Sequence, residues 1–239
     1  MPRTSRFLSE TNVYHIVLKG LNSEQIFYDD NDYLTFLKVL KKSSNDYDAQ
    51  VLAFCIMNNH IHLLMKFHEN NMAQMFKSFG ASFVLRYNNK YSRSGSLFNG
   101  RYYSKAVNDD SYLLTVLKYI HFNPIRAGLC ESPAEWKWSS YNEYVSENRI
   151  YTDIDFIYSI INKNQFFELH KTEVNDIFSF LPIENSINKL SDVQLKSIVI
   201  NMKEYFSDLD IAICLKKSGI PAYKISKLLG ISRAYAYKL

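Results

Sequence analysis

The sequence predicts an α+β fold with an antiparallel sheet that carries helices on one face, followed by an all-α region at the C-terminus. Two observations predict it. Up to residue 107, β-rich runs and helical apolar repeats follow the order β-α-β-β-α-β, and beyond that point the clearest apolar repeats are helical. The first order is typical of the split βαβ, or ferredoxin-like, arrangement that RRM-like domains adopt, and it leaves the other face of the sheet free.

Local patterns predict a first strand, a first helix and a hairpin. Residues 12–19 alternate between apolar and polar side chains and predict the first strand. Residues 30–42 place apolar side chains at helical spacing behind an aspartate start signal. Two β-rich runs, 49–56 and 60–67, are separated by Met57-Asn58-Asn59. Since asparagine tolerates the backbone angles of a tight turn, these runs predict a hairpin.

The next helix and strand also carry the most basic segment of the chain. Apolar side chains recur at three and four over residues 72–87, and residues 96–107 are again extended in pattern. Between residues 77 and 105 there are six cations, no acidic residue and interleaved aromatic rings; the cations are Lys77, Arg86, Lys90, Arg93, Arg101 and Lys105. This combination suits single-stranded or hairpin nucleic acid, and an amphipathic helix followed by a solvated hairpin is the alternative.

A third helix is predicted over residues 109–122, with two aspartates in its first turn. We expect it to end near Asn123, because Pro124 disfavours α geometry in the residue before it. Tyr119 and Asn123 are four residues apart and share a face if the last turn stays helical.

The C-terminal region divides by charge. The sheet domain is expected to span residues 1–145, and the acidic, helical segment 146–200 reads as a linker. Residues 201–239 hold seven Lys or Arg against three Asp or Glu. There, helices at 208–217 and 222–229 are followed by Gly230-Ile231-Ser232 and a short basic helix, a pattern typical of a helix-turn-helix DNA-binding module.

Composition sets the class of protein. With 47% hydrophobic and 22% charged residues, the 239-residue chain is an ordinary globular protein. It has no run of about 18 apolar residues and no secretory leader, so we expect a cytoplasmic protein without a membrane span. Cys55, Cys130 and Cys214 are far apart and odd in number, which argues against disulfides and a cysteine zinc site and predicts reduced core thiols.

Two histidines in the second arm of the hairpin form a candidate metal-binding pair. His60 and His62 are two residues apart, so the period of a strand puts both imidazoles on one face, with Ile61 and Leu63 on the other. Neutral imidazole is a common ligand for divalent cations. The spacing alone equally suits two structural histidines, and both interpretations stay open.

Several segments together resemble the REP-associated tyrosine transposases, bacterial HUH proteins of the IS200-like group with a single catalytic tyrosine. Asn58, Phe122 and Ile125 stand where proline, leucine and valine are common in that family, and none of these differences removes a reacting group. A C-terminal helix-turn-helix is similar to that of some members. The matching segments are Tyr14-His15-Ile16-Val17, Met57-Asn58-Asn59-His60-Ile61-His62-Leu63-Leu64, Arg93-Ser94-Gly95-Ser96-Leu97-Phe98-Asn99-Gly100-Arg101-Tyr102, Tyr119-Ile120-His121-Phe122-Asn123-Pro124-Ile125-Arg126-Ala127-Gly128 and Trp138-Ser139-Ser140-Tyr141.

The resemblance implies an HUH fold and a transposase-like enzyme that nicks and joins single-stranded DNA through a 5′-phosphotyrosine intermediate. It implies that Tyr119 is the nucleophile. His60 and His62 would bind a divalent metal, with Asn123 as a third, polar ligand. Mixed nitrogen and oxygen ligation suggests Mg²⁺ or Mn²⁺. The implied substrate is palindromic DNA folded as a short hairpin.

The chemistry can also be argued without the resemblance. A phenol has an ordinary pKa of about 10, so Tyr119 needs a neighbouring positive charge or a base to attack phosphorus. A metal at the predicted ligands would polarise the phosphate and help orient it for in-line attack. The phosphoester energy is kept in the covalent intermediate, so no nucleotide cofactor is needed. We expect His15 and His121 to be structural.

Basic residues are the expected DNA contacts. Those in the C-terminal module, Lys224 and Arg233, would add affinity for duplex DNA. A monomer is expected, with a homodimer as the alternative. The predicted contact residues are Arg86, Arg93, Arg101, Lys105, Arg126, Lys224 and Arg233.

Two other classes of function stay open. A catalytically silent DNA-binding regulator derived from a transposase would keep the basic surface without turnover. An RNA-binding sheet domain would carry aromatic residues on adjacent central strands in place of His60 and His62. Both alternatives are binding functions, so both predict that nucleic-acid binding is unchanged when Tyr119 is replaced by phenylalanine.

Overall fold

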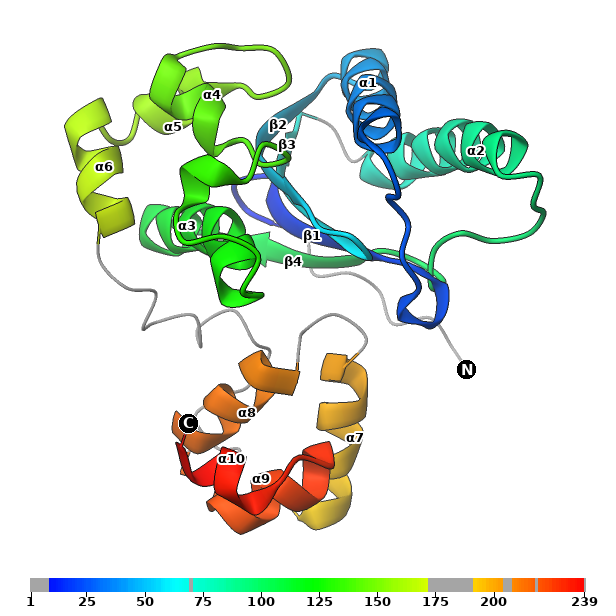
Figure 1. Ribbon diagram of the computed structural model, residues 1–239. Coiled ribbons are helices and arrows are strands. Elements are labelled where there is room, and N and C mark those ends of the chain that lie inside the picture. The colour runs from blue at the N-terminus through cyan, green and yellow to red at the C-terminus, as the bar shows by residue number, and fades with distance from the viewer. Residues whose placement is uncertain (1–8, 69–70, 172–190, 204–207, 218, 239) are drawn as a thin grey trace. The chain divides into compact units, whose positions relative to one another are not determined.

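The computed structural model describes residues 9–68, 71–171, 191–203, 208–217 and 219–238 (Figure 1). The chain forms two compact units, residues 1–174 and 175–239, and each is described by itself. The boundary falls within the predicted linker, 146–200, of which residues 172–190 lie outside the described part.

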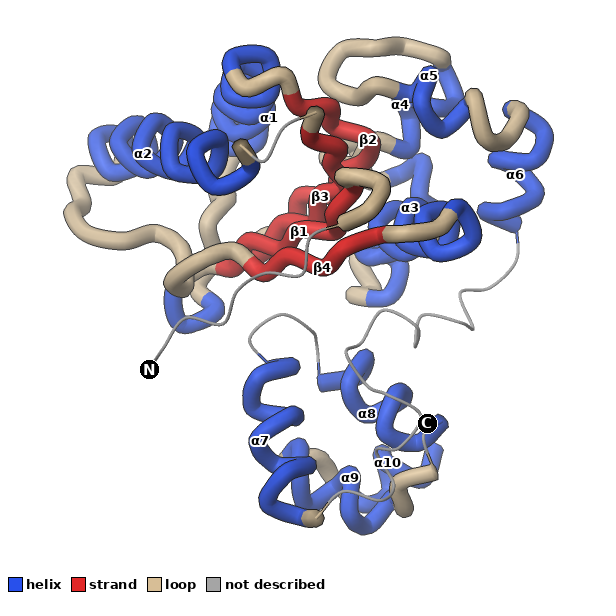
Figure 2. Tube along the Cα trace, turned by 180° about the vertical axis from the view of Figure 1, so that it is seen from behind, coloured by secondary structure: helices blue, strands red, loops and turns tan. Residues whose placement is uncertain are grey.

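One antiparallel sheet of four strands, in the order β2-β3-β1-β4, forms the centre of the first unit (Figure 2). A short 3-10 turn, η1 (Leu21–Ser23), follows the first strand. The first three predicted strands and the hairpin are confirmed, and β1 and β3 are the central pair. Of the predicted extended segment 96–107, only residues 103–107 form a strand, and Phe98 makes an isolated bridge to Gly20. The strands are β1 (Val13–Lys19), β2 (Ala49–Ile56), β3 (His60–Phe67) and β4 (Tyr103–Val107).

Helices α1 (Asp30–Asp46) and α2 (Met72–Lys90) cover one face of the sheet, as predicted (Figure 1). The alternation of the strands turns one set of apolar side chains toward them, including Leu18 and Leu63. These side chains pack with buried aromatic rings of both helices, such as Phe79, in one core. The apolar face of the sheet is therefore closed by α1 and α2.

Helix α3 (Asp110–Arg126) packs across the opposite face, which the order of strands and helices alone leaves free (Figure 2). Asp109 caps it by accepting a hydrogen bond from a backbone N–H of the first turn. The predicted end near Asn123 is wrong, because Pro124 lies inside the helix and the N–H of Ala127 still donates to the carbonyl of Asn123 (3.0 Å). Proline removes one donor but its fixed φ suits a helix, so Asn123 keeps the same face as the residue four before it.

The segment after α3 runs along β2, which is an edge strand. It contains η2 (Pro133–Glu135) and α4 (Tyr141–Ser146). The indole N–H of Trp136 donates to the carbonyl of Ile56 (3.1 Å), and the N–H of Ile56 donates to the carbonyl of Trp138 (2.9 Å). Backbone groups that an open edge would leave exposed are thus paired within the chain.

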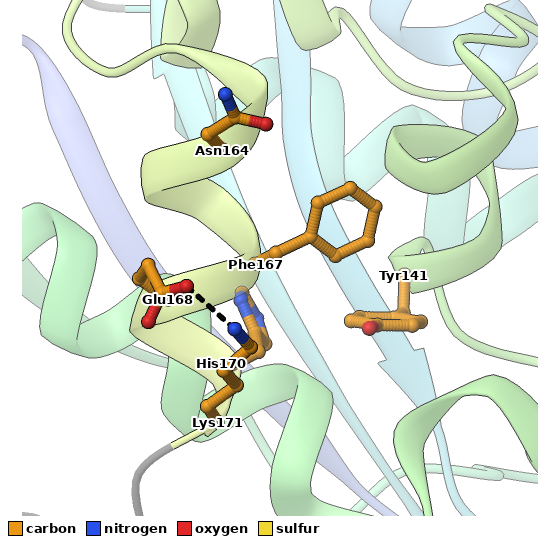
Figure 3. Close-up of a pocket in the computed structure, with 6 residues that line it drawn as sticks. All are labelled: Tyr141, Asn164, Phe167, Glu168, His170 and Lys171. Atoms are coloured by element: carbon orange, nitrogen blue, oxygen red, sulfur yellow. Dashed lines mark hydrogen bonds and ion pairs between the residues drawn. The ribbon is translucent and has the colours of Figure 1, made fainter.

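A buried polar network joins α3 to the end of this unit. His121 hydrogen-bonds through Nδ1 to Nε2 of His170 (2.9 Å) and through Nε2 to the hydroxyl of Ser140 (2.8 Å). Figure 3 shows His170 beside the ring of Tyr141, where a shallow pocket opens at the surface. The last helices of the unit are α5 (Ile154–Tyr158) and α6 (Lys163–Lys171), and α6 carries His170.

The second unit is helical in its described residues. Gly230 ends α9 in the left-handed conformation (φ 74°), and the hydroxyl of Ser232 accepts a hydrogen bond from the N–H of Tyr235 (3.1 Å) at the start of α10. The predicted turn between two helices is therefore present. The helices are α7 (Asp192–Lys203), α8 (Asp208–Lys217), α9 (Ala222–Leu229) and α10 (Arg233–Lys238).

The predictions from composition concern membrane-spanning helices and cysteines. None of the helices within the described ranges is both long and apolar enough to cross a membrane. Cys55 is buried and Cys130 is half-buried, and both are free thiols. The side chain of Cys214 lies outside the described part.

We predict that the free energy of unfolding falls as the pH drops from about 6.5 toward about 4. Burial lowers the pKa of His170 to about 4 and holds the pKa of His121 well below its usual range, so both rings are neutral in the folded chain. A depressed pKa stabilises the fold above the unfolded value, and this contribution is lost as the pH falls, by at most about 1.4 kcal/mol per pH unit for each ring. Chemical denaturation at several pH values measures the slope.

The variant His170→Gln tests the source of that slope, since glutamine can still hydrogen-bond but does not titrate. It should lose less stability per pH unit than the wild type. The exposed His68→Gln is the matched control and should leave the slope unchanged. Parallel curves for His170→Gln and wild type would exclude the network as the source.

Candidate active site

Three histidines lie on the face of the sheet that α3 covers. In the register of β1 and β3, His62 pairs with Val17 and His60 with Lys19. His15 lies on the same face of β1, because it is two residues before Val17. His15 and His62 are 0% and 1% exposed, and neither belongs to the apolar core beneath α1 and α2. Strand alternation therefore separates the imidazoles from that core.

Helix α3 places Tyr119 against these histidines. Its ring centroid lies 5.3 Å from that of His62 and 5.8 Å from that of His15, with each pair of rings close to perpendicular. One turn later, Nδ2 of Asn123 donates to the carbonyl of Tyr119 (3.1 Å), and the Asn123 side chain also hydrogen-bonds to His60. The structure brings together the predicted nucleophile and the three predicted metal ligands.

Hydrogen bonds hold the Nδ1 atom of each predicted histidine ligand. Nδ1 of His60 lies 2.7 Å from Oδ1 of Asn59. With the amide assigned this way, the oxygen only accepts, so Nδ1 carries the proton and Nε2 keeps its lone pair. Nδ1 of His62 lies 3.1 Å from Nε2 of His15, and a proton on Nδ1 there likewise leaves Nε2 of His62 open. Such outer contacts orient metal-binding histidines.

Burial keeps all three imidazoles neutral at pH 7. Burial, and then the charge of Lys19, lower the pKa of His60 to about 4. Burial, and then Lys105, lower the pKa of His15 to about 3. The pKa of His62 is held well below its usual range by burial and then by the neighbouring imidazoles. Since a metal binds only the neutral ring, the site is in the protonation state that metal binding requires.

The donor set fits a divalent cation. The rings of His60 and His62 are 5.1 Å apart and nearly perpendicular, and the side chain of Asn123 contacts His60. Two imidazole nitrogens and one amide oxygen form a mixed set that leaves coordination positions for a substrate and water. Across the described ranges, no three His, Cys, Asp or Glu side chains are grouped as ligands.

Two cations lie beside the cluster of histidines and Tyr119. The guanidinium carbon of Arg126 is 5.8 Å from the centroid of the Tyr119 ring, and its charge contributes to lowering the pKa of His62. Lys105 pairs with His15 in the register of β1 and β4. Burial lowers the pKa of Lys105 to about 8, which still leaves the amine mostly protonated at pH 7. Both side chains can attract a phosphate to this face.

The other predicted DNA contacts lie elsewhere. Arg86 is exposed on α2, and Arg93 donates to the carbonyl of Ser96 (3.1 Å) in the following loop. In the second unit Arg233 is exposed at the start of α10, whereas Lys224 forms an ion pair with Asp192. Arg101 is exposed on the loop before β4. These residues are not part of the histidine and tyrosine cluster.

His15 was expected to be structural, yet it contacts both His62 and Tyr119. One feature of the sequence could have predicted that His15 lies beside His62. In a ferredoxin-like sheet the first and third strands are neighbours, so a histidine in the first strand can share a face with one in the third. Which face it takes depends on the register, and the sequence does not fix the register. His121, by contrast, bonds to His170 and Ser140.

Comparisons with known proteins show the family of the chain. The family model described as "Transposase IS200 like" matches residues 9–123, which include all four strands and both predicted α3 residues of the site. A protein of Haemophilus influenzae described as a REP-associated tyrosine transposase is 30% identical over 127 residues, and the match covers 48% of this chain and 72% of that protein. A solved structure of a REP-associated tyrosine transposase bound to a REP hairpin has a TM-score of 0.54 at 15% identity, and the match covers 65% of this chain and 90% of that one. The chain therefore belongs to the REP-associated tyrosine transposases of the IS200-like transposase family.

Proposed function

We propose that this protein is a metal-dependent enzyme that nicks and joins single-stranded DNA through a 5′-phosphotyrosine. The observation that carries the proposal is the position of Tyr119, 5.3 Å from His62 between ring centroids and one helical turn from Asn123. A phenol beside two neutral imidazoles that can bind a divalent cation suits transfer of a phosphoryl group to tyrosine.

In the nicking step the Tyr119 oxygen attacks phosphorus in line with the bond to the 3′ oxygen. A bond forms between the phenolic oxygen and phosphorus, and the bond between phosphorus and the 3′ oxygen breaks. The phenol loses its proton and the departing 3′ oxygen gains one, so a 3′-hydroxyl is released. Attack by a 3′-hydroxyl reverses these changes and joins two strands, and no nucleotide is consumed.

The residues around Tyr119 divide the remaining tasks. When bound by His60, His62 and Asn123, a Mg²⁺ or Mn²⁺ ion would polarise a non-bridging oxygen of the phosphate. Arg126 is placed to stabilise negative charge on the phenolic oxygen and the phosphate, because its guanidinium lies beside the ring. Hydrogen bonds to both Nδ1 atoms keep the imidazoles oriented before the strand arrives.

The proposed substrate is palindromic DNA that folds as a hairpin. A relative of the same fold has been solved with a REP hairpin, and this supports the same class of substrate here. The exposed cations of the first unit and the helices of the second could grip the stem and its flanks. We expect a monomer by analogy with single-chain members of the family, with a homodimer as the alternative.

One of the alternative functions is disfavoured. An RNA-binding sheet domain needs an open sheet face with aromatic residues on its central strands. In the described residues, the corresponding face carries His15 and His62 on β1 and β3, and α3 covers it. A catalytically silent DNA-binding regulator would keep the same fold, and turnover distinguishes it from the proposed enzyme.

We predict that wild-type protein forms a covalent adduct with single-stranded DNA and that Tyr119→Phe lowers adduct formation by about 10³-fold or more, because it lacks the attacking oxygen. The substrate is a pool of labelled hairpins with randomised single-stranded flanks, incubated with Mn²⁺ or Mg²⁺. Denaturing gels measure the adduct, and sequencing of captured strands identifies the preferred flank.

Tyr112→Phe is the matched control, because Tyr112 lies two turns earlier on the same helix. It should retain the adduct. Hairpin binding by Tyr119→Phe should stay within a few-fold of wild type. An adduct that persists in Tyr119→Phe would identify a different nucleophile, and an absence of adduct in the wild type with normal hairpin binding would favour the silent regulator.

We predict that the protein binds one Mn²⁺ ion and that the affinity changes little between about pH 7 and about pH 6, because protons compete only as the pH approaches the depressed pKa of His60, about 4. His15 hydrogen-bonds to the ligand His62 but does not itself bind the ion, so His15→Phe should weaken Mn²⁺ binding by about 10- to 100-fold. His62→Ala removes a ligand and should weaken Mn²⁺ binding further. Calorimetry measures these affinities without turnover.

The exposed His68→Ala is the control for nonspecific histidine binding and should leave the affinity unchanged. An equal loss in His62→Ala and His68→Ala would show that the ion binds elsewhere. A steep fall of affinity between about pH 7 and about pH 6 would contradict histidine ligands that are neutral in this range.

In the second unit we predict that Arg233→Gln weakens duplex DNA binding and reduces the slope of log affinity against log salt by about 1, as expected for one lost phosphate contact. Lys224→Gln should have a smaller effect, because Asp192 already pairs with this amine. Fluorescence anisotropy across a salt series compares the two. Equal effects would mean that the ion pair opens on DNA.

A further inference from the structure

A second cavity lies in the first unit on the side of the sheet that faces α2. Its volume is about 460 Å³, which is within the range of roughly 300–1,000 Å³ typical of small-molecule sites. Four buried apolar side chains form its floor, and two cations, two glycines and a tyrosine stand around it. The floor residues are Leu18, Phe76, Phe79 and Phe98.

Gly80 keeps the wall of this cavity open. It lies in the middle of α2, where glycine is among the least favourable residues for a helix. A Cβ atom built on Gly80 would meet no described atom within 4 Å, so packing does not require glycine here. Its missing side chain instead leaves the backbone of α2 open to the cavity, so a ligand can approach that backbone closely.

The rim combines positive charge with an aromatic face. Lys77 and Arg101 are both exposed, and no acidic side chain is found among the lining residues that the structure describes. Tyr102 is held by packing on Phe76, with centroids 4.3 Å apart, and the guanidinium carbon of Arg101 lies 5.8 Å from the Tyr102 ring. Cations beside a fixed ring and an apolar floor suit a nucleotide, whose base is flat and whose phosphate is negative.

The cavity is also close to the proposed site along the chain. Leu18 in its floor is adjacent to Lys19, which pairs with His60 across β1 and β3. These neighbours face opposite sides of the sheet. The cavity and His60 therefore lie at the same end of β1, on opposite faces of the sheet.

We propose that this cavity binds one unstacked base of the single-stranded DNA substrate, with the base over Gly80 and a phosphate between Lys77 and Arg101. This inference rests on the proposed function, because that function supplies the ligand, a DNA strand. Binding of a base in the cavity does not depend on the nicking reaction. Part of the selectivity for single-stranded DNA would then come from residues on the α2 side of the sheet.

The test separates base contacts from phosphate contacts. Binding of an oligo(dT) of about 12 nucleotides is compared with binding of an abasic strand of the same length and charge, by anisotropy in a Tyr119→Phe background. Gly80→Leu should weaken oligo(dT) binding by about 5- to 100-fold and leave abasic binding unchanged, because the leucine occupies the place of the base. Lys77→Gln should weaken both strands and reduce the salt slope by about 1.

Ala81→Leu is the matched control, since Ala81 is the next residue on α2, is exposed and does not line the cavity. It should bind both strands as the parent does. Stability gives a second readout: Gly80→Ala should raise the Tm by about 2 °C through helix propensity, so any loss of binding in that variant cannot come from unfolding.

Equal losses of oligo(dT) and abasic binding in Gly80→Leu, or no loss of either, would overturn the base site. Displacement of oligo(dT) by micromolar thymidine monophosphate would also overturn it, because the cavity would then be a site for free nucleotides. Failure of the proposed function looks different, since the adduct with Tyr119 is then absent while the base-specific effect of Gly80→Leu persists.

Discussion

The alternation of side chains along β1 and β3 is the constraint on which the rest of the structure depends. One set of residues, including Leu18 and Leu63, packs into the core beneath α1 and α2, and the other set presents His15 and His62 to α3. A slip of one residue in the register would move the imidazoles into the apolar core. The same contacts that stabilise the sheet therefore fix the position of the histidines.

Desolvation is the cost of this arrangement. Burial lowers the pKa of His15 to about 3 and of His60 to about 4, and Nδ1 of His15 is buried with no hydrogen-bond partner among the residues that the structure describes. An unpaired buried polar atom costs about 1–3 kcal/mol. Functional sites commonly retain such local costs, and here neutral imidazoles are what a divalent cation needs. The hydrogen bonds to His62 and Asn59 offset part of the cost.

Much of the fold follows from local sequence patterns, whereas the errors concern long-range packing. The strand runs, the α1 and α2 repeats and the turn before α10 were predicted because each is encoded within a few residues. The end of the third helix was wrong, because packing of α3 on the sheet outweighs the local effect of Pro124. The roles of Tyr119 and Asn123 came from the resemblance, and their distance to the histidines depends on which face α3 covers. The contact of His15 with His62 depends on register, and the opening beside Gly80 depends on packing between α2 and the loop before β4.

If Tyr119 is the nucleophile, as proposed, its burial bears on the fate of the cut DNA. The side chain is only 1% exposed, with the imidazoles on one side and the guanidinium of Arg126 near its ring. A phosphodiester formed on an oxygen in such a place has little contact with bulk water, so hydrolysis would be slow while a tethered 3′-hydroxyl stays close. The depth of the phenol would thus commit the cut strand to resealing or exchange, and it would keep free broken ends rare in the cell.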